Sequence, residues 1–117
     1  DWSSDVCSYD LQNPAGNVTT LAVRQRLVDL AAEHGFWIFE DDPYGDLRFA
    51  GEDVPRMVDL DTAGRVIYST SFTKTVAPGI RAGALLLPEE LRKGMAYIAN
   101  QTYIGAVNFA HGAVAEY

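Results

Sequence analysis

The chain has a single cysteine, Cys7, among its 117 residues, so no disulfide can form within it. Basic residues are also few, because 9 Lys and Arg stand against 16 Asp and Glu, for a net charge of -7 and a pI near 4.6. A segment this acidic has no basic patch for a phosphate backbone, so we expect no nucleic-acid partner for it. No apolar run approaches the ~20 residues of a membrane span, and no secretory signal pattern opens the chain. We therefore expect no membrane partner and a cytoplasmic location.

The composition that remains, 48% hydrophobic and 21% charged, is that of an ordinary globular protein. Helical and strand patterns alternate from residue 12 onward, which predicts an α/β fold. We expect a partial three-layer sandwich, with a mainly parallel sheet and helices on both faces. The predicted strands are 36–41, 66–70 and 82–87, and the predicted helices lie at 20–35, near 55–60, from Pro88 and from Asn108. In the first helix the apolar positions Val23, Leu27, Leu30 and Ala31 define the face expected to be buried.

Residues 1–11 show neither helical nor strand periodicity. They resemble the translated adapter tails found at the ends of environmental gene fragments. We therefore interpret 1–11 as a non-native leader and assign the functional domain to 12–117.

The loop 71–83 places several reactive side chains between two apolar runs. Lys74 lies close in sequence to the hydroxyls of Ser71 and Thr73, and a Pro-Gly turn separates it from Arg81. A lysine that attacks a carbonyl must first lose its proton, which a neighbouring cation or an apolar wall favours. Arginine and hydroxyl groups bind phosphate monoesters, because charge-assisted hydrogen bonds are stronger than neutral ones. The loop therefore predicts a site for a phosphorylated aldehyde.

Two further motifs precede this loop: the turn 13–16, Asn-Pro-Ala-Gly, and the strand end 40–44, Glu-Asp-Asp-Pro-Tyr. In this order and at these intervals, the three motifs resemble those of the fold type I pyridoxal phosphate enzymes, the aminotransferase class I and II superfamily. The matching family patterns are an Asn-Pro-x-Gly turn, an Asp-x-x-Tyr strand end and a Ser-x-x-Lys loop with Pro-Gly before the arginine. The resemblance runs from Gln12 to the C-terminus and implies that 12–117 is part of the family's large, cofactor-binding domain.

The resemblance implies pyridoxal 5'-phosphate as the cofactor and gives each motif residue a role. Lys74 is implied as the Schiff-base residue and as the base that moves a proton between the substrate α-carbon and the cofactor. Asp41 is implied beside the pyridine nitrogen, where a carboxylate keeps that nitrogen protonated. Tyr44 and Asn13 are implied as partners of the cofactor's phenolic oxygen. The implied phosphate ligands are Ser71, Thr73 and Arg81, and no metal site is implied.

The implied activity is transamination between an amino acid and a 2-oxo acid, in a full-length protein that is a homodimer. The family's ring-stacking aromatic residue and its carboxylate-binding arginine fall outside these 117 residues, so we expect the isolated chain to be inactive. Two alternatives stay open. One is a lyase or decarboxylase of the same fold, and the other is the aminotransferase-like sensor domain of a helix-turn-helix transcription regulator.

Simpler interpretations exist for single residues. Asp41 and Asp42 could end a strand before a turn at Pro43, and only the other motifs favour a site role. His34, near a predicted helix C-terminus, and His111 are interpreted as structural.

Overall fold

The computed structural model describes residues 6–9, 17–103, 105 and 107–117, with side chains from residue 17 onward. Four strands form one sheet in the order β1-β2-β3-β4. The first three are parallel and β4 runs antiparallel to β3. The strands are β1 (Val6–Tyr9), β2 (Ile38–Asp41), β3 (Val66–Ser71) and β4 (Gly83–Leu86). The α-helices are α1 (Leu21–His34), α2 (Met57–Leu60), α3 (Glu89–Tyr103) and α4 (Asn108–Ala115), with short 3-10 turns η2 (Gly45–Leu47) and η3 (Pro78–Ile80). The predicted mainly parallel α/β sheet is thus confirmed.

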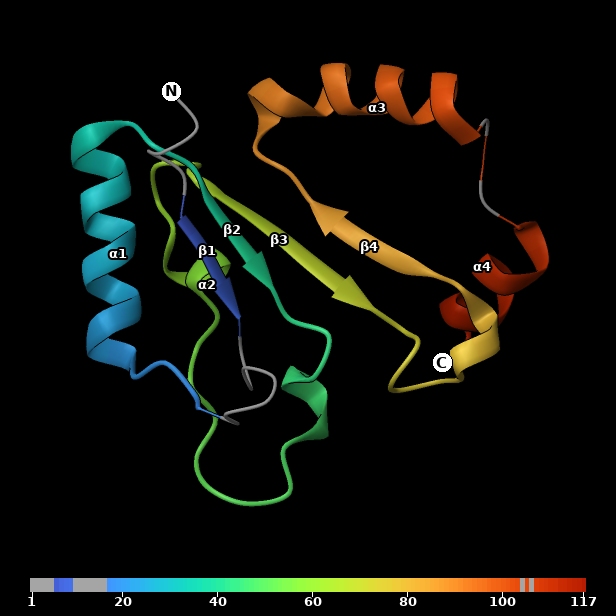
Figure 1. Cartoon of the computed structure of the whole chain (residues 1–117), viewed down its shortest axis with the longest axis horizontal. Coiled ribbons are helices and arrows are strands. Elements are labelled where there is room, and N and C mark those ends of the chain that lie inside the picture. Colours follow the sequence, from blue (N-terminus) through green and yellow to red (C-terminus); the bar gives the residue numbers. More distant parts are fainter. Residues whose placement is uncertain (1–5, 10–16, 104, 106) are drawn as a thin grey trace.

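The core forms where α1 and α2 pack on the same face of the sheet (Figure 1). Its buried members are Val28, Ala31, Ile38, Met57 and Val66. α3 and α4 lie beyond β4 in Figure 1, and α3 has no buried residue. The packed part of the molecule is therefore the β2–β3 region under α1 and α2.

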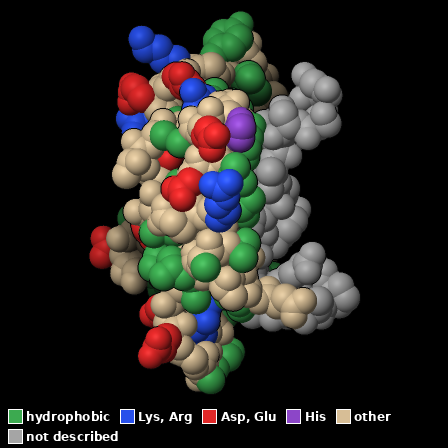
Figure 2. Space-filling view, turned by 90° about the vertical axis from the view of Figure 1, so that its left-hand side faces the viewer, with side chains coloured by type: hydrophobic (Ala, Val, Ile, Leu, Met, Phe, Trp, Pro, Cys, Tyr) green, Lys and Arg blue, Asp and Glu red, His purple; other side chains and the backbone are tan. Residues whose placement is uncertain are grey.

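α1 begins after Thr20 and ends at Gly35, as the sequence predicts. Gly35 has a φ of 77° and its N–H donates to the Ala31 carbonyl, a helix end that glycine adopts readily. The predicted face is confirmed at Ala31, which is buried, and at Leu27, which packs against the core, but the other buried positions of α1 are Arg24 and Val28. Val23 is 49% exposed instead, and Figure 2, which faces the α1 side, shows apolar groups among charged ones there. A buried arginine is not expected from hydropathy and depends on partners elsewhere in the fold.

β2 is shorter than predicted and has two unlike faces. Ile38 and Glu40 are buried, whereas Phe39 on the opposite face is 37% exposed. The apolar run 36–39 had suggested a strand covered on both faces, and the described residues cover only one. β3 and β4 fall within a residue of the predicted bounds.

β1 lies within residues 1–11, where the sequence shows no helical or strand periodicity. Val6–Tyr9 pairs in parallel with β2, opposite 38–41. Four residues are too few to show a periodicity, and the strand is defined by its pairing with β2. The proposed non-native origin of 1–11 stays a prediction.

No helix in the described part of the chain is long and apolar enough to cross a membrane.

Candidate functional site

β2 and β3 end at the same edge of the sheet, because they are neighbouring parallel strands. Asp41 closes β2 and pairs in register with Ser69, two residues before the end of β3 at Ser71. Open α/β sheets place their ligands at the carboxyl ends of the strands. The pairing thus brings the 40–44 motif and the lysine loop, about thirty residues apart, to one edge.

Lys74 lies in the turn that follows β3. The Val76 N–H donates to the Phe72 carbonyl at 3.0 Å, which closes the turn around the lysine. The Lys74 Nζ lies 5.8 Å from the centre of the Tyr44 ring, within the range of a cation–π contact. Lys74 is exposed and makes no hydrogen bond or ion pair within the described residues. Its amine therefore stands beside the Tyr44 ring and is open to a ligand.

Ser71 and Thr73 form a small hydroxyl pair at the start of this turn. The Ser71 hydroxyl donates to Thr73 Oγ1 at 2.9 Å, and the Thr73 N–H donates to Ser71 Oγ at 3.3 Å. Arg81 follows η3 with a φ of 51°, the only positive φ of a non-glycine residue in the described part of the chain. Its side chain is exposed and has no hydrogen-bond or ion-pair partner there. No such bond joins Arg81 to the hydroxyl pair.

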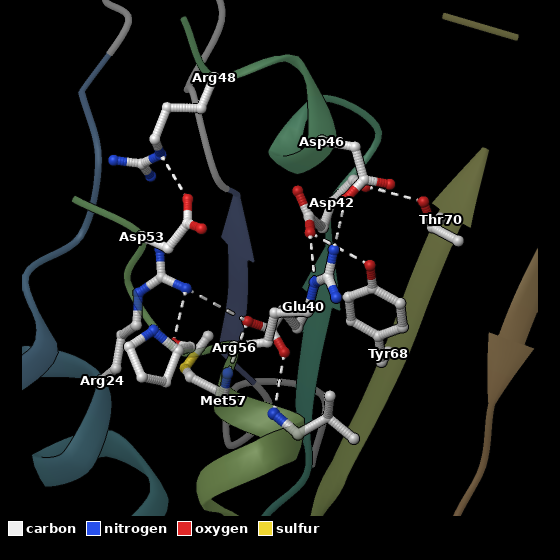
Figure 3. Close-up of polar contacts among 12 residues, drawn as sticks. Arg24, Glu40, Asp42, Asp46, Arg48, Asp53, Arg56, Met57, Tyr68 and Thr70 are labelled. Carbon is white, nitrogen blue, oxygen red and sulfur yellow. Dashed lines mark hydrogen bonds and ion pairs between the residues drawn. The ribbon is translucent and has the colours of Figure 1, made fainter. Parts of the chain in front are cut away.

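Asp41 and Asp42 have opposite surroundings. The Asp41 side chain is half-buried and has no hydrogen-bond or ion-pair partner among the described residues. The Asp42 carboxylate is 2% exposed and accepts hydrogen bonds at Oδ2 from Arg56 Nε and the Tyr68 hydroxyl, both at 3.1 Å (Figure 3). The structure therefore leaves only Asp41 of the two available to an outside partner.

Arg56 and Tyr68 have perturbed acidities around Asp42. Burial, together with the negative charge of Asp42, raises the pKa of Tyr68 to about 12, so the phenol remains a hydrogen-bond donor at neutral pH. Burial by itself would lower the pKa of Arg56. Its hydrogen bond to Asp42 and the charges around it outweigh that effect, and the pKa is raised. Arg56 also contacts Asp46 Oδ1 at 2.7 Å.

A second buried polar cluster joins β2 to α1 and α2, and the sequence did not predict it. The Glu40 carboxylate accepts the N–H groups of Met57 at 2.8 Å and Val58 at 3.0 Å, at the start of α2. Arg24 Nη1 lies 3.7 Å from Glu40 Oε1 and donates to the Pro55 carbonyl at 3.1 Å. Both side chains are 2–3% exposed. Burial raises the pKa of Glu40, against the lowering effect of those hydrogen bonds and of the Arg24 charge. The sequence gives one indication of this cluster, namely an acidic residue, Glu40, directly after the apolar run 36–39.

Asn13, the remaining predicted site residue, lies outside the described residues. Within them, no group of three or more His, Cys, Asp and Glu could hold a metal ion.

The fold of the chain is similar to that of solved aminotransferase structures. Kynurenine aminotransferase from Pyrococcus horikoshii superposes with a TM-score of 0.84 and 35% identity, over 90% of this chain and 27% of that one. The sequence model of the aminotransferase class I and II family matches residues 6–116. The chain belongs to the aminotransferase class I and II family.

Two relatives illustrate the range of that family. An aromatic-amino-acid aminotransferase of Thermococcus litoralis is 46% identical over 70% of this chain and 20% of its own length. A probable rhizopine catabolism regulatory protein of Rhizobium meliloti is 38% identical over 78% of this chain and 18% of its own length. The chain thus spans about a fifth of the length of these relatives.

Proposed function

We propose that the protein containing this chain is a pyridoxal phosphate-dependent aminotransferase that moves an amino group between an amino acid and a 2-oxo acid. The observation that carries the proposal is the position of the Lys74 amine, unpaired within the described residues and 5.8 Å from the Tyr44 ring centre. Membership of the family supports the same reaction class.

The charges at this edge fit such a cofactor. Lys74, Arg81 and Asp41 make no hydrogen bond or ion pair with other side chains in the described part of the chain. An amine, a guanidinium and a carboxylate are the groups required for an aldehyde, a phosphate and a ring nitrogen, respectively. The hydroxyls of Ser71 and Thr73, already hydrogen-bonded to each other, add phosphate donors. These groups support the proposal that the aldehyde, the phosphate and the ring nitrogen of pyridoxal phosphate bind at this edge.

Each residue then has a distinct task. Lys74 Nζ would hold the cofactor covalently and afterwards carry the proton to and from the substrate α-carbon. Asp41 would keep the ring nitrogen protonated, and Tyr44 and Asn13 would donate to the phenolic oxygen. When bound, the cofactor supplies an electron sink for the carbanion character that develops at the α-carbon. The phosphate would be held by Ser71, Thr73 and Arg81.

The test uses the two lysines of the chain, Lys74 and Lys93, as site and internal control. The protein expressed from its complete gene is incubated with pyridoxal phosphate, reduced with borohydride and digested for peptide mapping. We expect the pyridoxyl group on the Lys74 peptide and none on Lys93, an exposed residue of α3. Lys74→Ala should remove the label and the amino-group transfer, whereas Lys93→Ala should keep both. Labelling of Lys93 in place of Lys74 would contradict the assignment.

The similarity to the rhizopine regulatory protein favours one second candidate, a cofactor-sensing domain of a transcription regulator. Such a protein would be labelled at Lys74 but would transfer no amino group. Assaying the labelled protein with a panel of amino acids and 2-oxoglutarate, and in parallel for DNA binding, separates the two. The homodimer of the full-length protein, the cytoplasmic location and the assignment of 12–117 to the large domain stay predictions.

A further inference from the structure

We propose that Asp42, held by Arg56 and Tyr68, is a positioning residue that fixes the end of β2 and thereby orients Asp41 and Tyr44 toward Lys74. This inference rests on the proposed cofactor site. It gives a functional task to the aspartate that the site itself does not use.

The side chain of Asp42 is fixed from two elements. Arg56, at the start of α2, and Tyr68, in the middle of β3, both donate to Oδ2 at 3.1 Å (Figure 3). A buried carboxylate needs such partners, since an unpaired buried charge is strongly destabilising. Arg56 is itself held by Asp46 and lies over the Tyr68 ring at 5.4 Å from its centre. The cluster of Asp42, Arg56 and Tyr68 is called the clamp below.

The backbone of Asp42 is tied to β3 as well. Its N–H donates to the Ser69 carbonyl at 2.8 Å, and its own carbonyl accepts the Thr70 hydroxyl at 2.9 Å. β3 continues into Ser71 and the lysine turn. Asp42, one of the two residues between Asp41 and Tyr44, is thus fastened to the strand that leads to Lys74.

Gly45, directly after Tyr44, lies against the Asp42 carboxylate. A Cβ at this position would collide with both carboxylate oxygens of Asp42, so only glycine fits without a shift. Asp42 Oδ1 is buried and has no hydrogen-bond partner among the described residues. The carboxylate is therefore placed by contact with the Gly45 backbone on one side and by two donors on the other.

Side chains alternate along a strand, so a clamp on Asp42 sets the direction of Asp41 on the opposite face. Loosening the clamp should rotate the end of β2 and alter how Asp41 and Tyr44 meet the cofactor. A purely structural cluster would change stability without this effect.

Tyr68→Phe tests the difference, since phenylalanine keeps the ring under Arg56 and removes only the hydroxyl bound to Asp42. The matched control is Tyr103→Phe, at a tyrosine that is 64% exposed in α3. The protein expressed from its complete gene and loaded with pyridoxal phosphate is titrated with pH, following the visible absorbance of the lysine-bound cofactor. We expect the titration midpoint to shift by about 0.5–1 pH unit in Tyr68→Phe, the size that loss of one hydrogen bond produces. Tyr103→Phe should leave it unchanged.

Arg56→Lys is the second variant, because it keeps the positive charge and removes the Nε donor. A midpoint that stays at the unaltered value in both variants, with the melting temperature lowered, would overturn the positioning role while leaving the proposed function in place. A protein with no visible band and no label on Lys74 before any substitution would instead overturn the proposed function and this inference with it. A shifted midpoint in both variants, with the Lys74 label retained, supports the clamp.

Discussion

The two faces of β2 differ in how their charges are paired. On the face toward α1 and α2, Glu40 and Asp42 are buried, and each meets an arginine, Arg24 and Arg56. At the carboxyl edge and on the other face, Asp41, Lys74 and Arg81 have no hydrogen-bond or ion-pair partner among the described residues. Within the motif 40–44, Glu40 and Asp42 are thus buried and paired, whereas Asp41 between them has no such partner.

This difference separates the charges that stabilise the fold from the charges that are available to bind a ligand. Paired buried charges fix the fold, since removing one partner leaves an uncompensated charge in the interior. Charged side chains without a protein partner, at the carboxyl ends of parallel strands, are available to a ligand. Substitutions on the paired face should therefore affect stability most, and those at the carboxyl edge should affect cofactor binding and turnover most.

The largest expected effect is on stability at the paired face. Arg24→Met keeps much of the side-chain volume but leaves Glu40 buried without its arginine, so we expect a loss of about 3–5 kcal/mol in the free energy of unfolding. Urea denaturation measures it. The control is Arg26→Met, an exposed position two residues along α1, for which a change within about 0.5 kcal/mol is expected. Equal losses of unfolding free energy in Arg24→Met and Arg26→Met would contradict the stabilising role of the buried Arg24–Glu40 pair.

The adjacent aspartates give the sharpest contrast. Asp41→Asn should leave the melting temperature nearly unchanged and reduce turnover by about 10²–10³-fold, the usual cost of losing one electrostatic partner of the reacting group. Asp42→Asn should lower the melting temperature more and turnover less, because its carboxylate is bound by Arg56 and Tyr68. The opposite ranking would mean that Asp42 is the residue beside the ring nitrogen.

A substitution of Arg81, one of the charges without a protein partner, should have a smaller effect than the substitution of Asp41. Arg81→Gln should weaken pyridoxal phosphate binding by about 10–100-fold, the value of one or two charge-assisted hydrogen bonds, with little change in melting temperature. Arg92→Gln, at an exposed arginine of α3, is the control and should bind as the unaltered protein does. Equilibrium dialysis of the cofactor distinguishes them. A lower melting temperature with unchanged affinity for pyridoxal phosphate would mean that Arg81 stabilises the fold and does not bind the phosphate.

The smallest effect concerns the titration of Tyr68. Its pKa is raised to about 12 by burial and by the charge of Asp42, whereas an unfolded tyrosine titrates near 10. The stability that this phenol contributes is therefore complete below about pH 10 and is lost as the pH rises through about 12. Ultraviolet titration of the unaltered protein against Tyr68→Phe should give a difference band with its midpoint near the upper value. A midpoint near 10 would mean that the hydroxyl is exposed in solution.

Local patterns alone predicted the elements whose signals lie within a few residues. α1 ends at Gly35 and α2 lies near Met57, and β2 and β3 fall close to their expected runs. The lysine loop was equally local, because Ser71, Thr73 and Lys74 lie within four residues. The catalytic and cofactor roles of these residues stay predictions.

Tertiary structure decided which charges are buried. Arg24 replaces Val23 on the buried face of α1 because its partners, Pro55 and Glu40, come from other elements. Asp42 is paired where Asp41 is not because Arg56 and Tyr68, 14 and 26 residues away in the chain, reach the face on which Asp42 lies. Hydropathy and periodicity describe one segment at a time, whereas burial of a charge depends on donors supplied by distant ones. The sequence by itself thus determined the elements and the motif set, and packing determined which aspartate remained available at the site.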